Sequence, residues 1–183
     1  MPDEARKAAS DRIARLLTER FPPDVFASFA GYWPFRREFD CLPYLRQVVD
    51  AGGQAVLPVV IQPRSALEFR AWTPQSRMEK GVWGILHPAD GPPQRPAALL
   101  SPLVGFDAEG YRLGYGAGYY DRTLEAREDR PLVIGVGFES QRLPTIHPQP
   151  HDIPMDWIVT EAGLWPTPAG LARRRAQSSL PPG

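Results

Sequence analysis

Residues 98–136 read ALLSPLVGFDAEGYRLGYGAGYYDRTLEAREDRPLVIGV, and this stretch indicates the fold. Aliphatic runs at its beginning and its end predict two buried strands. Between them a turn signal, DAEG, is followed by three glycines two apart and then by YYDRTLEAR, which has helical composition. A strand, a loop, a helix and a further strand are typical of a mostly parallel sheet covered by helices, in which ligands bind at the carboxyl ends of strands.

The alternation of helix and strand patterns continues on both sides of this stretch. Upstream, apolar residues three and four apart predict a helix that starts at Asp3 and ends before Pro22, and LPYLRQVVDAGG predicts a second helix. The two strands of the opening stretch are ALLSPLVGF and PLVIGVGF, and further strands are predicted in VFASFAGYW, QAVLPVVI, ALEFRAW and HDIPMDWIVTE. ARRRAQSSLPPG is expected to be a frayed tail. These patterns predict a single α/β domain.

Length and charge limit the classes of protein that this chain can represent. Its 183 residues suffice for one α/β domain and are too few for two, and 21 basic residues balance 21 acidic ones. No global basic field favours nucleic acid, and no apolar run approaches the ~18 residues of a membrane span. With no signal-peptide pattern, we expect a cytoplasmic protein, a monomer, that binds neither nucleic acid nor a membrane. Cys41, the single cysteine, excludes an intramolecular disulfide and is expected to be buried rather than nucleophilic.

The glycine loop has two interpretations. Glycine allows positive φ and lets backbone N–H groups approach a ligand closely, so such a loop either binds phosphate or is merely tight. The spacing matches neither G-x-G-x-x-G nor the P-loop pattern, which disfavours a Rossmann oxidoreductase. Arg112 and Arg122 can bind phosphate, and Asp121 can hold a hard cation, so the neighbouring residues favour phosphate binding.

The run LVGFDAEGYRLGYGAGYYDRTL closely resembles the signature of the 5-formyltetrahydrofolate cyclo-ligase family, also called methenyltetrahydrofolate synthetase. Weaker matches follow the same order along the chain, from roughly Phe26 to Gly163: YWPFRREFD, LPVV and LEFRAWTP upstream, IGVGFESQ and LPTIHPQPHDIPMDWIVTE downstream. The resemblance implies a single three-layer α/β/α domain with a doubly wound, mostly parallel sheet. We place that domain at residues 1–168 and a flexible tail at residues 169–183.

The resemblance implies a reaction that uses ATP and Mg²⁺ to convert 5-formyltetrahydrofolate into 5,10-methenyltetrahydrofolate, with release of ADP and phosphate. In this reaction ATP is expected to phosphorylate the formyl oxygen, after which the folate N10 attacks the activated carbon and phosphate departs. The protein then has to align the reactants and neutralise developing charge, which requires backbone N–H donors, arginine and a metal ion.

The resemblance also assigns roles to individual positions. The residues expected to contact ATP are Arg112, Leu113, Gly114, Tyr115, Gly116, Ala117, Gly118, Tyr119 and Tyr120. Folate is expected at Trp33, Glu38 and the run from Tyr115 to Tyr119, because a carboxylate suits the N–H donors of a pterin and an aromatic surface suits its ring. Arg112 and Tyr119 are expected to act in catalysis. Asp121 and Asp156 correspond to magnesium ligands, with a helix or turn cap as the alternative for each.

The chain departs from the family pattern at three places. Members usually begin with a basic helix that reaches the nucleotide phosphates, whereas MPDEARKAASDRIARLL resembles the following helix, so that Arg6 or Lys7 would have to replace it or a segment precedes Met1. His87 stands where many members carry an acid, and Ala117 stands where glycine or lysine is common, which requires a negative φ there. The alternative function is therefore a non-catalytic folate- or nucleotide-binding relative with an incomplete phosphate site.

The histidines raise the question of a metal site. His147 and His151 are four residues apart, but Pro148 and Pro150 prevent the helix that would place them on one face. We expect loop roles for both of them and for His87.

Overall fold

The computed structural model describes residues 2–178. Seven strands form the central sheet in the order β11-β10-β9-β6-β1-β2-β3, with five parallel inner strands and an antiparallel strand at each edge. The strands are β1 (Ser28–Ala30), β2 (Gln54–Val59), β3 (Glu68–Ala71), β6 (Ala98–Pro102), β9 (Leu132–Val136), β10 (Trp157–Thr160) and β11 (Gly163–Pro166). The helices are α1 (Asp3–Arg20), α2 (Leu42–Asp50), α3 (Tyr119–Glu125) and α4 (Pro168–Ser178).

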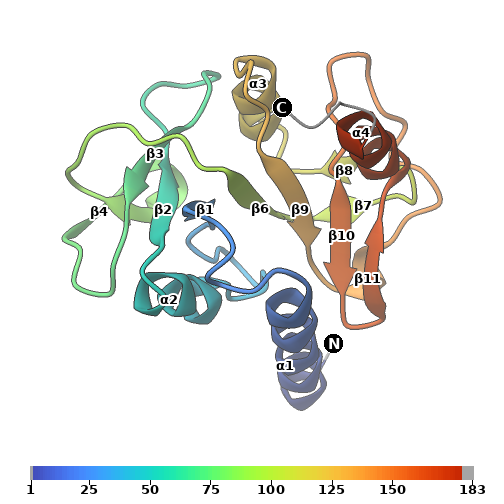
Figure 1. Ribbon diagram of the computed structural model, residues 1–183, viewed down its shortest axis with the longest axis horizontal. Helices are drawn as coiled ribbons and strands as arrows, with labels where there is room; N and C mark the ends of the chain where they lie inside the picture. Colours follow the sequence, from blue (N-terminus) through green and yellow to red (C-terminus); the bar gives the residue numbers. More distant parts are fainter. Residues whose placement is uncertain (1, 179–183) are drawn as a thin grey trace.

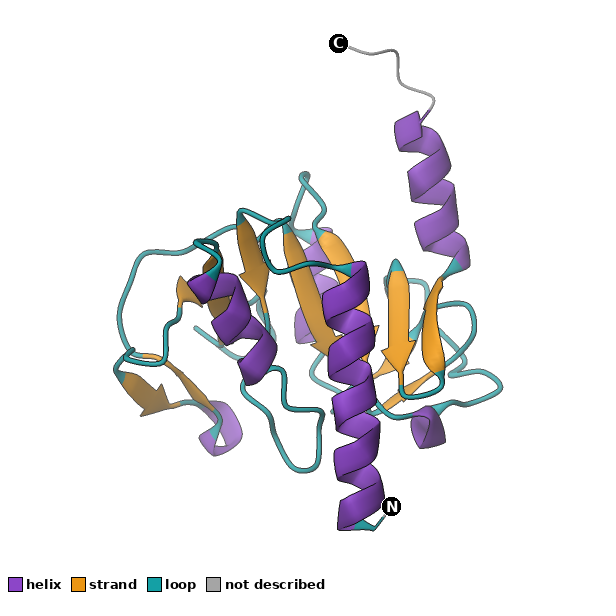
Figure 2. Cartoon of the chain, turned by 60° about the horizontal axis from the view of Figure 1, so that its bottom comes forward, coloured by secondary structure: helices purple, strands orange, loops and turns teal. Residues whose placement is uncertain are grey.

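Helices cover both faces of this sheet. Helices α1 and α2 lie on one face and α3 lies on the other (Figures 1 and 2). Because successive strand residues point to opposite faces, Leu99 packs in the cluster that contains Leu124 of α3, while Leu100 packs with Leu17 of α1 and Leu45 of α2. The structure thus confirms the predicted three-layer, doubly wound α/β fold.

The sheet contains one point where the winding direction reverses. From β1 the chain passes through α2 to β2 on one side, and from β6 it passes through α3 to β9 on the other side. Strands β1 and β6 are paired directly, with Phe29 opposite Ala98 and Ala30 opposite Leu99. The chain therefore leaves their carboxyl ends in opposite directions, which opens a crevice of the kind in which α/β proteins bind ligands.

Two short hairpin sheets extend from the main sheet. The first joins β4 (Met78–Lys80) to β5 (Leu86–Pro88) through the short helix η1 (Val82–Gly84). The second joins β7 (Gly105–Phe106) to β8 (Arg112–Leu113), directly before the glycine loop.

The hairpins correct two of the sequence predictions. The single strand predicted in ALLSPLVGF breaks between β6 and β7, because the chain leaves the main sheet there for the second hairpin. His87 lies in strand β5 and not in a loop.

The carboxyl terminus also differs from the prediction. Residues 168–178 form helix α4 instead of the flexible tail expected from residue 169, and residues 179–183 lie outside the described part of the chain. Arg173 donates hydrogen bonds to the carbonyl oxygens of Pro131 (2.8 Å) and Arg130 (2.6 Å), so this arginine ties the helix to the segment just before β9. Among the described helices, none combines the length and the apolar character that a membrane span requires.

Candidate active site

A cavity of about 510 Å³ lies at the reversal point of the sheet. Its walls come from the chain segments that follow β1 and β6, from the β4–β5 hairpin and from residues 146–152. Most of the site residues predicted from the sequence line this cavity: Trp33, Glu38, Arg112, Leu113, Gly114, Tyr115, Gly116, Ala117, Gly118, Tyr119, Tyr120 and Asp121. The fold therefore brings together residues that are more than 80 positions apart in the sequence.

The glycine loop presents bare backbone to the cavity. Gly116 and Gly118 have positive φ (+87° and +64°), whereas Ala117 does not, as an alanine at this position requires. A Cβ added to Gly114 would meet no atom within 4 Å, and the backbone of Gly114 does not need positive φ. Within the described chain, no backbone N–H of residues 114–118 donates a hydrogen bond. Such a loop fits close approach by a ligand that accepts hydrogen bonds.

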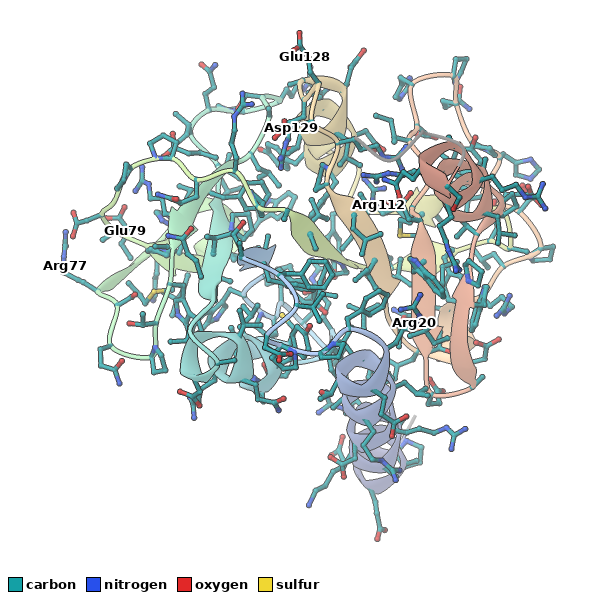
Figure 3. The ribbon with its side chains drawn as sticks, viewed as in Figure 1. Arg20, Arg77, Glu79, Arg112, Glu128 and Asp129 are labelled. Atoms are coloured by element: carbon teal, nitrogen blue, oxygen red, sulfur yellow. The ribbon has the colours of Figure 1, made fainter. Side chains whose placement is uncertain are left out.

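Arg112 and Arg122, the two arginines beside the loop, donate their hydrogen bonds to other groups of the protein. Arg112 donates to Asp121 Oδ1 (3.2 Å) and to the carbonyl oxygen of Ile153 (3.2 Å), while Arg122 donates to the carbonyl oxygen of Ala117. Burial lowers the pKa of Arg112, and the charge of Asp121 opposes that change. Figure 3 shows Arg112 within the body of the molecule, in contrast to Arg77 at the outer edge of β4. The arginines therefore fix the shape of the loop.

The two aspartates predicted to bind magnesium lie in different surroundings. Asp121 lines the cavity, and its Oδ1 also accepts the N–H of Ile153 (3.0 Å), while its Oδ2 has no hydrogen bond to any described residue. Asp152 contributes a second carboxylate to the same cavity. Mg²⁺ is usually held by one or two carboxylates together with substrate phosphates, so Asp121 fits such a site.

Asp156 is not among the residues that line the cavity, and its side chain is only 2% exposed. Its Oδ2 accepts the N–H of Val133 (2.8 Å) and a hydrogen bond from Arg173 (3.0 Å), and Arg130 lies 3.5 Å from its Oδ1. The structure therefore does not bring Asp156 into the cavity with Asp121. In residues 2–178 no group of three or more histidine, cysteine, aspartate or glutamate side chains is arranged to hold a metal.

Glu38 is a carboxylate without a cationic partner. Its Oε2 accepts the N–H of Phe35 (2.8 Å), and no described arginine, lysine or histidine forms an ion pair with it. Burial raises the pKa of Glu38, and hydrogen bonds from the Phe35 N–H and the Tyr115 hydroxyl offset part of that rise. An unpaired, partly buried carboxylate in a cavity is characteristic of a functional site.

Three aromatic rings form one side of the cavity, and we call Phe35, Trp83 and Tyr115 the aromatic wall. The rings of Phe35 and Trp83 are stacked with centroids 6.3 Å apart, and Tyr115 meets both of them edge-on at 5.7 and 6.0 Å. The sequence analysis identified Tyr115 but missed Phe35 and Trp83. The sequence signal for a tight turn at Trp83 was the pair of glycines that flank VW. In the structure Trp83 lies in this turn with a positive φ of 55°.

The three histidines lie at the cavity, whereas the cysteine is buried away from it. His87, His147 and His151 all line the cavity, the latter two from the loop in which they were predicted. Cys41 is buried, as expected, and burial raises the pKa of its thiol to about 12, which disfavours the nucleophilic thiolate at neutral pH.

These features describe a doubly wound α/β protein whose cavity combines a loop of free backbone N–H groups with a wall of aromatic rings. The sequence profile of the 5-formyltetrahydrofolate cyclo-ligase family matches residues 3–161, and the chain belongs to this family of ligases. The chain is 32% identical over 173 residues to the 5-formyltetrahydrofolate cyclo-ligase of Escherichia coli K12, covering 90% of this chain and 93% of the relative. It is 25% identical over 160 residues to that of Haemophilus influenzae, covering 83% of each chain.

Solved structures show the same fold. The 5,10-methenyltetrahydrofolate synthetase of Aquifex aeolicus superposes with a TM-score of 0.78 at 28% identity, covering 92% of this chain and 86% of that one. The synthetase of Mycoplasma pneumoniae gives a TM-score of 0.69 at 23% identity, covering 88% and 90%.

Proposed function

We propose that this protein catalyses the ATP-dependent cyclisation of 5-formyltetrahydrofolate to 5,10-methenyltetrahydrofolate, with release of ADP and phosphate. One observation carries the proposal: the bare glycine loop opens into the same cavity as Glu38 and the aromatic wall. A phosphate group and a flat ring with N–H donors can therefore bind side by side. Membership of the cyclo-ligase family supports this pair of substrates.

In the proposed reaction the formyl oxygen attacks the γ-phosphorus of ATP and ADP leaves. N10 then attacks the activated formyl carbon and loses its proton, and the former formyl oxygen departs with phosphate. The protein contributes mainly alignment and charge stabilisation. The N–H groups of residues 114–118 face the phosphates, Glu38 accepts hydrogen bonds from the pterin, and Tyr119 borders both ligands.

Magnesium, when bound, would neutralise phosphate charge. We assign its protein ligand to Asp121, whose Oδ2 remains available to the cavity, and not to Asp156, whose carboxylate is occupied by two arginines.

One observation favours the second candidate, a non-catalytic relative that binds folate or a nucleotide. Arg112 is the only arginine or lysine that lines the cavity in the described part of the chain, and it is already paired with Asp121. Arg6 and Lys7 of α1 are not among the lining residues. The phosphates would then depend on backbone donors and on a bound cation.

A direct assay separates the two candidates. The protein is mixed with 5-formyltetrahydrofolate, ATP and Mg²⁺, and the absorbance of the methenyl product and the amount of ADP are followed together. We expect one ADP per methenyl product and no product when ATP or Mg²⁺ is left out. Folded protein that binds ATP and folate without forming product would establish the non-catalytic candidate instead.

We also propose that the protein acts as a monomer in the cytoplasm. Size-exclusion chromatography with light scattering tests the oligomeric state, and a dimer would contradict it.

A further inference from the structure

Arg36 is an exposed cation on the aromatic wall. Its guanidinium carbon lies 5.1 Å from the ring centroids of both Phe35 and Tyr115, two residues that line the cavity. In the described part of the chain, Arg36 forms no ion pair, whereas its neighbour Arg37 pairs with Asp3 at 2.5 Å. The charge of Arg36 therefore lies beside the cavity without an acidic partner among residues 2–178.

The backbone at Arg36 is in the left-handed region, with a φ of 55°. This conformation is unfavourable for a residue with a Cβ, and such outliers concentrate at ligand-binding sites. Arg37, which follows it, has no positive φ. Two adjacent arginines thus differ in backbone conformation, in partner and in position relative to the cavity.

The charges inside the cavity explain why a cation beside it matters. Three carboxylates, those of Glu38, Asp121 and Asp152, line the cavity, whereas Arg112 is the only arginine or lysine among the described lining residues. An anionic group of a ligand is therefore disfavoured in the interior unless the glycine loop or a metal ion holds it. A second anionic group on the ligand would need a cation beyond the aromatic wall, and Arg36 is located there.

We propose that Arg36 binds a carboxylate of the glutamate tail of the folate substrate. The inference rests on the proposed function, because it takes the folate as the ring-bearing ligand of the cavity. The pteridine and aryl rings pack in the cavity, and the charged tail stays in water at its mouth, where its carboxylate meets the guanidinium. Charge-assisted hydrogen bonds of this kind, in a partly exposed position, contribute about a tenfold preference for the charged tail.

The experiment compares two ligands by calorimetric titration: 5-formyltetrahydrofolate and an analogue in which an uncharged amide replaces the glutamate. We expect the unaltered protein to bind the natural ligand about tenfold more tightly than the neutral analogue. Arg36→Gln keeps a long polar side chain but removes the charge, so it should abolish this preference and leave the affinity for the neutral analogue unchanged. Arg36→Lys should restore part of the preference, and the matched control Arg37→Gln should retain all of it.

Three results would overturn the inference. A preference that persists in Arg36→Gln would show that this arginine only packs on the rings. An equal loss of affinity for both ligands would indicate a general role in the shape of the wall, and a loss of ATP affinity with the tail preference intact would assign Arg36 to phosphate. If the unaltered protein binds neither folate ligand, the proposed function fails together with this inference, which distinguishes that case from the other three.

Discussion

Replacing Glu38 with glutamine should separate folate recognition from nucleotide binding and from folding. Glutamine has nearly the same shape as glutamate, and its amide oxygen can still accept the Phe35 N–H that Glu38 Oε2 accepts at 2.8 Å. What is lost is the negative charge that would accept hydrogen bonds from the pterin. Loss of hydrogen bonds to a charged group costs roughly 1.5–3 kcal/mol, so folate affinity should fall about ten- to a hundredfold.

The same variant should not lose stability, although it loses folate affinity. Because burial raises the pKa of Glu38, the folded protein holds this proton more tightly than the unfolded chain does. Stability is therefore highest below the ordinary pKa of glutamate and falls as the pH rises through the raised pKa of the folded state. At neutral pH the ionised carboxylate is unfavourable for folding, so Glu38→Gln should unfold at the same temperature as the unaltered protein or at a higher one.

The measurements are calorimetric titrations with 5-formyltetrahydrofolate and with ATP, and thermal unfolding at pH 7. We expect weaker folate binding, unchanged ATP binding and an unfolding temperature that does not fall. Equal folate affinities of variant and unaltered protein would refute the assignment of Glu38 to folate. A parallel loss of both affinities with a lower unfolding temperature would show that Glu38 is structural.

Three further predictions concern the loop and the aspartates. Asp121→Asn should raise the magnesium concentration needed for half-maximal activity several-fold and also lower stability, since the buried Arg112 loses its countercharge. The control Asp90→Asn should change neither, because Asp90 and its partner Arg77 are both largely exposed. Gly114→Ala should weaken ATP binding without lowering the unfolding temperature. Gly116→Ala, at φ +87°, should instead lower stability by about 1–2 kcal/mol. Identical behaviour of the two variants would contradict a ligand role for Gly114. Asp156→Asn should lower the free energy of unfolding by about 3–5 kcal/mol in denaturant titrations, because two arginines lose their partner. A changed magnesium requirement at unaltered stability would make Asp156 a metal ligand after all.

Local patterns of the sequence were sufficient for the fold class and for one half of the site. The spacing of apolar residues predicted α1 and α2, and aliphatic runs predicted the inner strands, because burial on one or both faces imposes a period on the sequence. The three glycines followed by a helix predicted a loop that exposes backbone, since the conformations of Gly116 and Gly118 depend on the residues themselves.

Other features depend on contacts between distant segments, which no local pattern records. Trp83 meets Phe35 and Tyr115 only because the β4–β5 hairpin folds back over the reversal point of the sheet. Asp156, just before β10, is paired with Arg130, which precedes β9, and with Arg173 of α4, so its acidic character and its sequence context did not reveal its role. The layers and the glycine loop follow from local sequence, because apolar periodicity and φ preferences are properties of neighbouring residues. Which charges remain free for a ligand depends on the folded molecule, because ion pairs form between side chains that come together from separate segments.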